Sequence, residues 1–288
     1  MKSLPSLLLA LLATSTAMGL TIPDDILFET GVEYSNAGGQ HLQMNIARPK
    51  NISEPLPAIL CIHGGGFRAG TREGYDELCV KLAGHGYVAA TVTYRLAPEF
   101  QYPAAVLDCK AAVRWLRANA AKQGIDPNRI GVTGGSAGGH LAQFLGVTQG
   151  VKMFDVGEHL DQSSDVACVV NLYGPSDFTK SYGKSVDAAE VLPLFFGGGL
   201  DTKLKEHIQG SPLYWVTPNA APTLIIHGTE DKYVNHEQAV WMAEKMKAAQ
   251  VDVELLTLEG AGHGFSGANA EKADAAMLAF FDRRLKPD

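Results

Sequence analysis

Short apolar segments alternate with longer amphipathic segments along most of this chain. Between the apolar segments, and after the last of them, the periodicity predicts helices near residues 73–84, 104–122, 137–148, 236–249 and 269–285. The apolar segments have the composition of buried strands and cover residues 56–62, 87–93, 129–133, 166–172, 222–226 and 253–258. This alternation predicts an α/β fold in which helices cover a mostly parallel sheet.

Two segments depart from the alternation. Residues 32–48 have the pattern of a hairpin that turns at 36–39 and leads into the sheet. Residues 177–218 are too long for a simple crossover, and we expect a small, partly helical insertion over the edge of the sheet where the strands end. Ligands bind at this edge in open α/β folds.

The N-terminus resembles a secretory leader. Lys2 precedes a leucine-rich apolar run, and small residues follow up to Gly19. The run is shorter than the roughly 20 residues that a membrane span needs. We therefore expect residues 1–19 to be a signal peptide and residues 20–288 to be a single α/β domain that is secreted or periplasmic and has no membrane span.

Charge and cysteine content narrow the function classes. The chain has a formal charge of −7, which becomes −8 when the one lysine of residues 1–19 is removed. This acidic balance and the absence of a Lys/Arg cluster argue against nucleic acid as a partner. The four cysteines include no C-x-x-C pair, and we expect buried thiols, with Cys79–Cys109 as the pairing worth testing. No spacing of His, Cys or acidic residues indicates a metal site.

The pentapeptide G-G-S-A-G at 134–138 carries the strongest chemical signal. It follows a predicted strand and opens onto a predicted helix, which is the context of a nucleophile elbow around Ser136. Glycines are needed because the serine has a strained backbone and a Cβ at 134 or 138 would collide with the adjoining strand or helix. The alternative is a glycine-rich turn in which the serine caps the helix.

A serine nucleophile needs a base and an acid. Asp231 follows one late strand and His263 follows the last, so the order Ser136, Asp231, His263 is the one expected for this fold. Glu230 and Asp177 compete for the role of acid, but Glu230 is expected to face away and Asp177 to cap the segment that follows it. The other histidines near these motifs precede the acid, point away along a helix or begin one, whereas His263 lies on a glycine-flanked loop.

The segment H-G-G-G-F at 63–67 follows the first long strand. Its glycines let backbone N–H groups approach a tetrahedral oxygen, and we assign Gly65, Gly66 and Ala137 to an oxyanion hole. Gly64-x-Gly66-x-x-Ala69 also matches a dinucleotide fingerprint, but no acidic residue ends the next strand to hold a ribose. We therefore expect no nicotinamide or other cofactor.

Together these motifs resemble a known family. H-G-G-G-F at 63–67, Y-R-L-A-P-E at 94–99 with Y-P-A-A at 102–105, D-P-N-R-I at 126–130 and G-G-S-A-G-G at 134–139 resemble the α/β-hydrolase esterases of the hormone-sensitive-lipase type. Residues 211–213 and 222–234 are more similar to the compact bacterial acetylxylan and feruloyl esterase branch. The resemblance implies that Ser136, Asp231 and His263 form the triad and that residues 94–99 with Asp108 are scaffolding. The large N-terminal cap of the lipase-like branch is expected to be reduced to residues 20–30.

The resemblance implies a serine carboxylesterase acting on short-chain or aryl esters, small or attached to plant-cell-wall polysaccharide. A peptidase of the prolyl-oligopeptidase type, an arylformamidase and a non-catalytic binding protein are the alternatives; the peptidase usually has a further β-rich domain, for which we expect no room. Phe67, Phe265, Phe195 and Phe196 are candidates for substrate contact. Phe195 and Phe196 either wall the acyl pocket or only dock the insertion onto the sheet.

Overall fold

The computed structural model describes residues 19–286, so the expected leader at 1–18 lies outside the described residues. Eight strands form one sheet in the order β1-β2-β4-β3-β5-β6-β7-β8. Their bounds are β1 Ile26–Ser35, β2 Leu42–Pro49, β3 Leu56–Ile62, β4 Val88–Val92, β5 Ile125–Gly135, β6 Cys168–Leu172, β7 Thr223–Gly228 and β8 Val253–Leu258. β1, β2 and β4 pair antiparallel in turn, and all other neighbours pair parallel. The fold is the predicted α/β-hydrolase fold.

The first strand begins earlier than the sequence pattern indicated. Residues 26–30 were expected to be what remains of an N-terminal cap, but they belong to β1 and pair with β2 through residues such as Ile26 opposite Pro49. Ile26 is buried in the core at 4% exposure, which explains why this segment pairs with the sheet. The hairpin turn falls at 36–39 as predicted, within a short 3₁₀ helix at Ala37–Gly39.

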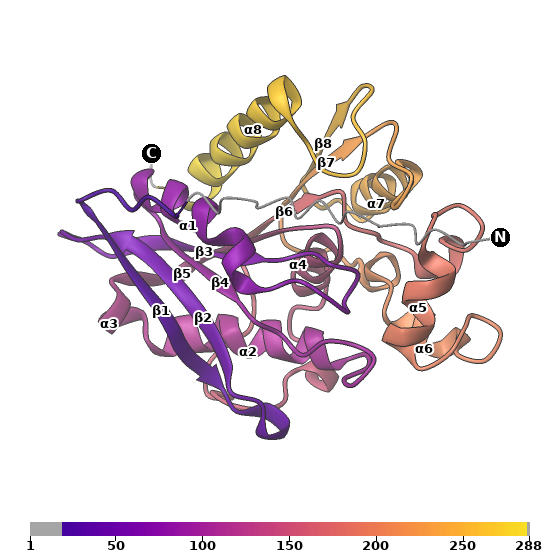
Figure 1. Cartoon of the computed structure of the whole chain (residues 1–288), viewed down its shortest axis with the longest axis horizontal. Coiled ribbons are helices and arrows are strands. Elements are labelled where there is room, and N and C mark those ends of the chain that lie inside the picture. Colours follow the sequence, from indigo (N-terminus) through magenta and orange to yellow (C-terminus); the bar gives the residue numbers. More distant parts are fainter. Residues whose placement is uncertain (1–18, 287–288) are drawn as a thin grey trace, which may run out of the picture.

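Helices cover both faces of the sheet (Figure 1). Their bounds are α1 Asp76–Gly84, α2 Ala104–Ala118, α3 Ala120–Gln123, α4 Ala137–Val147, α5 Ala188–Phe196, α6 Leu204–Gln209, α7 Glu237–Ala248 and α8 Gly267–Leu285. α1 and α8 pack on one face, and α2, α4 and α7 pack on the other. Because both faces are covered, the central parallel strands are apolar on both sides, as their sequence pattern predicted.

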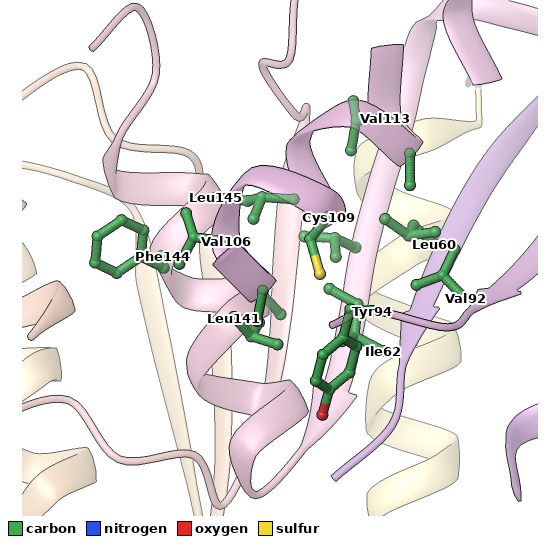
Figure 2. Close-up of a cluster of buried hydrophobic side chains, with 14 of the residues drawn as sticks. Leu60, Ile62, Val92, Tyr94, Val106, Cys109, Val113, Leu141, Phe144 and Leu145 are labelled. Carbon is green, nitrogen blue, oxygen red and sulfur yellow. The ribbon is translucent and has the colours of Figure 1, made fainter. Parts of the chain in front are cut away.

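Strand β3 shows how this pattern divides the core. Leu60 and Ile62 point to the face that carries α2 and α4, where they pack with Cys109 and Leu141 (Figure 2). Ile59 and Cys61 alternate with them and point to the face that carries α1 and α8. The period of two along the strand therefore builds two separate cores.

The candidate disulfide between Cys79 and Cys109 is not formed. Cys79 on α1 and Cys109 on α2 lie in the clusters on opposite faces of the sheet, and all four cysteines are free and buried. The Cα atoms of two cysteines on opposite sides of the sheet lie too far apart for a disulfide to join them. The expected buried thiols are confirmed, and they act as small apolar side chains in the core.

The segment 177–218 forms the expected partly helical insertion. It contains α5 and α6 together with the 3₁₀ helices η4 (Phe178–Lys180) and η5 (Pro212–Trp215). Figure 1 shows α5 and α6 side by side at one end of the molecule, beyond β6 and α4. Across residues 19–286, the structure has no helix with the length and apolar character needed to cross a membrane.

Candidate active site

Ser136 lies at a sharp turn between β5 and α4. Its φ of 57° and ψ of −121° are strained for a residue with a side chain. A Cβ at Gly138 would lie 2.0 Å from the carbonyl oxygen of Ile62, and one at Gly134 would lie 2.5 Å from the backbone of Gly138. Only glycines allow strand and helix to approach this closely, which is the reason predicted from the sequence. The turn lifts the serine hydroxyl into an open pocket.

The structure brings the three predicted catalytic residues together. His263 Nε2 lies 2.9 Å from Ser136 Oγ, and His263 Nδ1 lies 2.8 Å from Asp231 Oδ2. The histidine comes from the loop after β8 and the aspartate from the loop after β7. With its Nδ1–H donated to the carboxylate, the imidazole has Nε2 free to accept the serine proton.

Close packing between two loops sets this alignment. A Cβ at Gly228 would lie 2.2 Å from the carbonyl oxygen of Ala261, so glycine lets the loop after β7 contact the loop after β8. Glu230 N donates to that same carbonyl at 2.9 Å. Asp231 and His263 are thereby held opposite each other by backbone contacts.

Asp231 stays ionised in this environment. Burial raises the pKa of its carboxyl, but hydrogen bonds from His227, His263 and the Val234 N–H outweigh burial and hold the pKa well below its usual range. Its Oδ1 accepts the N–H groups of Tyr233 and Val234, each at 2.9 Å. An ionised acid at this position can stabilise the imidazolium that forms when His263 takes a proton.

Two tyrosines flank the imidazole of His263. The ring centroid of Tyr173 lies 4.9 Å away and that of Tyr233 lies 5.1 Å away. Tyr173 has a φ of 44°, an unusual value for a residue with a side chain. Phe265 packs perpendicular to Tyr173 at a centroid distance of 5.0 Å and is not among the residues that line the pocket, so its contact with substrate stays a prediction. It supports the ring that supports His263.

The loop 63–70 places the predicted oxyanion donors beside Ser136. Gly65 has a φ of 114°, and a Cβ there would lie 2.2 Å from the carbonyl oxygen of Ala69, so this turn requires glycine. Gly65, Gly66 and Ala137 all line the same pocket as Ser136. As the first residue of α4, Ala137 has an N–H without an intrahelical partner, at the positive end of the helix.

The motif at 94–99 supports this loop, as the resemblance implied. The Tyr94 hydroxyl donates to the His63 carbonyl at 2.9 Å, and Ala97 N donates to the Phe67 carbonyl at 2.9 Å. Arg95 binds the buried Asp108 on α2, with Nη2 at 2.7 Å from Oδ1. Two elements distant in sequence from the elbow therefore fix the position of the oxyanion loop.

A pocket of about 560 Å³ opens over Ser136. Phe67 lines it as predicted, and the insertion contributes Phe178, Val191 and Leu192 together with polar side chains such as Asp187. This volume suits a ligand of drug-like size.

Phe195 and Phe196 do not line this pocket, so their assignment as its wall is wrong. Phe195 stacks on Phe67 at 4.0 Å, and Phe196 packs 4.2 Å from the ring of His207. Both are almost fully buried, at 1% and 2% exposure. They dock the insertion onto the core, one helical turn beyond Val191 and Leu192 on the same buried face of α5.

The residues rejected as base or acid have other roles. Asp177 caps η4 by accepting the Thr179 N–H at 3.0 Å, as expected. His140 is fully buried in α4, and its Nε2 lies 2.7 Å from the Gly210 carbonyl at the end of α6. Among residues 19–286, no group of three or more His, Cys, Asp or Glu side chains is placed to hold a metal ion.

Sequence reasoning missed several residues of this site. Val191 and Leu192 precede the phenylalanines that drew attention, and Tyr173 directly follows the strand that ends at Leu172. His227 lies against Asp231 Oδ2 at 3.3 Å. The dipeptide His227-Gly228 at a strand end was the available signal for this contact, but the sequence pattern does not show which way its side chain points.

The fold is that of an α/β-hydrolase, and the contacts around Ser136 form a Ser-His-Asp arrangement in its pocket. The BD-FAE family model matches residues 44–246 of the chain. The chain therefore belongs to the BD-FAE family. It is 35% identical to esterase LipC of Mycobacterium tuberculosis over 83% of this chain and 62% of that protein. It is 31% identical to an ethyl acetate hydrolase of Pseudomonas putida, over 83% of this chain and 77% of the relative.

Solved structures agree with this assignment. A truncated form of a carbohydrate esterase from gut microbiota superposes with a TM-score of 0.81 at 28% identity, covering 92% of this chain and 99% of that one. An esterase from Thermogutta terrifontis gives a TM-score of 0.76 at 28% identity, covering 90% and 94%. The chain spans less than two thirds of the length of LipC.

Proposed function

We propose that this protein is a serine carboxylesterase that cleaves esters through an acyl-enzyme on Ser136. The observation that carries the proposal is the continuous chain of contacts from Asp231 Oδ2 through both nitrogens of His263 to Ser136 Oγ, at 2.8 Å and 2.9 Å. A serine hydroxyl is a weak nucleophile by itself and needs such a base.

The proposed reaction has two half-reactions. Ser136 Oγ attacks the ester carbonyl while His263 Nε2 takes its proton, and the N–H groups of Gly65, Gly66 and Ala137 receive the developing oxyanion. The imidazolium then protonates the departing alcohol as the carbon–oxygen bond breaks. In the second half, water attacks the acyl-enzyme with His263 as the base, and the acid and free serine are released.

This chemistry assigns the two sides of the pocket. The leaving oxygen must lie within reach of His263 Nε2, so the alcohol group extends toward Tyr233, which lines the pocket and is about half exposed, at 49%. The acyl group extends the opposite way, toward Val191 and Leu192 of the insertion. A short or aryl acyl group on a larger, partly solvated alcohol fits this division.

We further propose that the alcohol is part of a carbohydrate and that the protein is exported. The carbohydrate esterase with 28% identity and a TM-score of 0.81 supports the first point. A bifunctional GH43-CE protein of Bacteroides eggerthii also matches, with a TM-score of 0.79 at 27% identity over 92% of this chain and 38% of that one. The leader-like sequence at 1–19 supports export.

A panel of esters tests the proposal. It contains p-nitrophenyl acetate through laurate, methyl ferulate and acetylated xylan, each assayed with wild type and Ser136→Ala. We expect hydrolysis of the short esters by wild type and a loss of at least about a thousandfold in the variant. Equal rates for the two proteins, or no hydrolysis of any ester by wild type, would overturn the assignment. Release of acetate from xylan decides the carbohydrate proposal separately.

A further inference from the structure

A second histidine is buried against the acid of the triad. His227 is fully buried at the end of β7, and its Nε2 lies 2.7 Å from the Val234 carbonyl and 3.3 Å from Asp231 Oδ2. Its Nδ1 is buried and has no hydrogen-bond partner among the described residues. Because the Val234 carbonyl oxygen and Asp231 Oδ2 both face Nε2, the neutral ring of His227 carries its proton on Nε2.

His227 completes a set of contacts around the Asp231 carboxylate. The Tyr233 and Val234 N–H groups hold Oδ1, whereas Oδ2 receives His263 at 2.8 Å and faces His227. The same proton of His227 also fixes the Val234 carbonyl. One side chain thus connects the carboxylate to the turn that supplies both of its backbone donors.

We propose that His227 is a positioning residue that restrains Asp231 and limits the negative charge that its Oδ2 presents to His263. The inference rests on the proposed function. A shared hydrogen bond to Oδ2 weakens that oxygen as an acceptor for the His263 imidazolium. Removing the donor strengthens the pairing of Asp231 with protonated His263, so neutral His263, the form that accepts the serine proton, should be reached only at higher pH.

The groups that face this cluster are few in the described part of the chain. The ring of His236, which precedes α7, lies perpendicular to that of His227 at a centroid distance of 5.7 Å, and its Nε2 lies 3.1 Å from the Thr257 hydroxyl. Tyr173, after β6, and Tyr233 contact His263 on its two sides. Of these groups, His236 is a matched control, because its ring packs against His227 and, in the described part of the chain, forms no hydrogen bond or ion pair with Asp231.

Three variants separate positioning from packing. His227→Phe keeps a ring but removes the donor, His227→Gln keeps a donor near the position of Nε2, and His236→Phe alters the neighbouring ring. For each, kcat, KM and the pH dependence of kcat/KM are measured with a short p-nitrophenyl ester, and Tm is measured in parallel.

We expect His227→Phe to lower kcat about tenfold, the low end for a lost hydrogen bond to a charged group, while KM changes less than twofold. The acid limb of its kcat/KM profile should move to higher pH by about half a unit or more, because Asp231 then pairs more strongly with protonated His263. His227→Gln should recover most of the lost kcat and return the limb toward the wild-type position. His236→Phe should leave the limb in place.

An unmoved limb in folded His227→Phe, or the same shift in His236→Phe, would overturn the inference. A second measurement does not depend on activity: ¹⁵N spectra of histidine-labelled protein at pH 8 should show the His227 ring, assigned by its loss in His227→Phe, as the Nε2–H tautomer, which His140 should share because its Nε2 faces the Gly210 carbonyl. Assignment of His227 as the Nδ1–H tautomer would contradict the geometry. If wild type hydrolyses no ester, the proposed function fails instead, while the tautomer still reports on His227.

Discussion

The catalytic loops and the insertion at 177–218 build the same pocket in different ways. Ser136, Asp231 and His263 each follow a parallel strand, so the sheet itself brings their loops to one edge. The insertion reaches the pocket through side-chain packing, with Phe195 stacked on Phe67 at 4.0 Å. Chemistry therefore depends on backbone positions that the fold imposes, whereas the shape of the acyl side depends on how one apolar helix docks.

The difference predicts that damage to the two regions has different consequences. Changes in the catalytic loops should remove turnover and leave stability intact. Changes in the docking residues of the insertion should cost stability without altering substrate preference. Changes in its pocket-lining residues, which are also buried, should alter substrate preference as well.

The largest effect is expected at the acid. Asp231→Asn removes the charge that fixes the His263 tautomer, and kcat should fall by about 10⁴-fold while KM and Tm change little. Steady-state kinetics and thermal melts measure both. A loss below tenfold in a correctly folded variant would assign the role of acid to another carboxylate.

The docking contact is expected to act on stability. Phe195 is 1% exposed, and Phe195→Ala should lower the free energy of unfolding by about 3–5 kcal/mol because it leaves a cavity beneath α5. The preference among acetyl, butyryl and lauryl esters should not change. Denaturant unfolding and the ester series test this pair of outcomes, and an altered preference at unchanged stability would return Phe195 to the pocket wall.

His140 links the two regions, because it lies in α4 and bonds the Gly210 carbonyl. Burial lowers the pKa of His140 from 6.5 to about 4, so between these values the unfolded chain binds a proton that the folded protein does not. Stability therefore falls as pH decreases through this window, and His140 accounts for about 3 kcal/mol of that loss. In His140→Gln, denaturant unfolding from pH 7 to 4 should show a correspondingly shallower loss; an identical loss would contradict this.

The smallest effect is expected at the pocket wall. Leu192→Ala enlarges the acyl side, and the ratio of kcat/KM for laurate to that for acetate should rise by about 1–3 kcal/mol of discrimination. Phe196→Ala, which changes a docking residue four positions along the same helix, is the matched control. If the laurate-to-acetate ratio changes in Phe196→Ala and not in Leu192→Ala, the acyl group binds elsewhere.

The sequence predicted the catalytic side of the pocket more fully than its acyl side. Ser136 and Gly134 lie in a motif whose spacing is dictated by backbone sterics, and the loops of Asp231 and His263 follow strands with clear apolar patterns. No comparable constraint governs α5, where Val191, Leu192 and Phe195 are all apolar. Val191 and Phe195 share one face of this helix a turn apart, so which of them reaches the pocket depends on where the helix docks, and local pattern does not specify that.

The same limit applies to side chains that meet across the fold. The Cys79–Cys109 pairing was proposed because both lie on helices, but the strand crossovers place those helices on opposite faces of the sheet. His227 was set aside as the base because it precedes the acid, and its contact with Asp231 depends on the turn at 228–234. Such contacts are long-range or depend on turn geometry, and periodicity carries no information on either.

The central claim is that Ser136 is the nucleophile of an esterase. A fluorophosphonate, which reacts with activated serines, is incubated with the protein, and intact mass and peptide mapping locate the adduct while ester hydrolysis is followed in parallel. The account predicts one adduct per chain, on Ser136, formed as activity is lost. Ser136→Ala should form no adduct, and His263→Ala should form it much more slowly than wild type. An adduct on another residue, or hydrolysis that continues after Ser136 is fully modified, would contradict it.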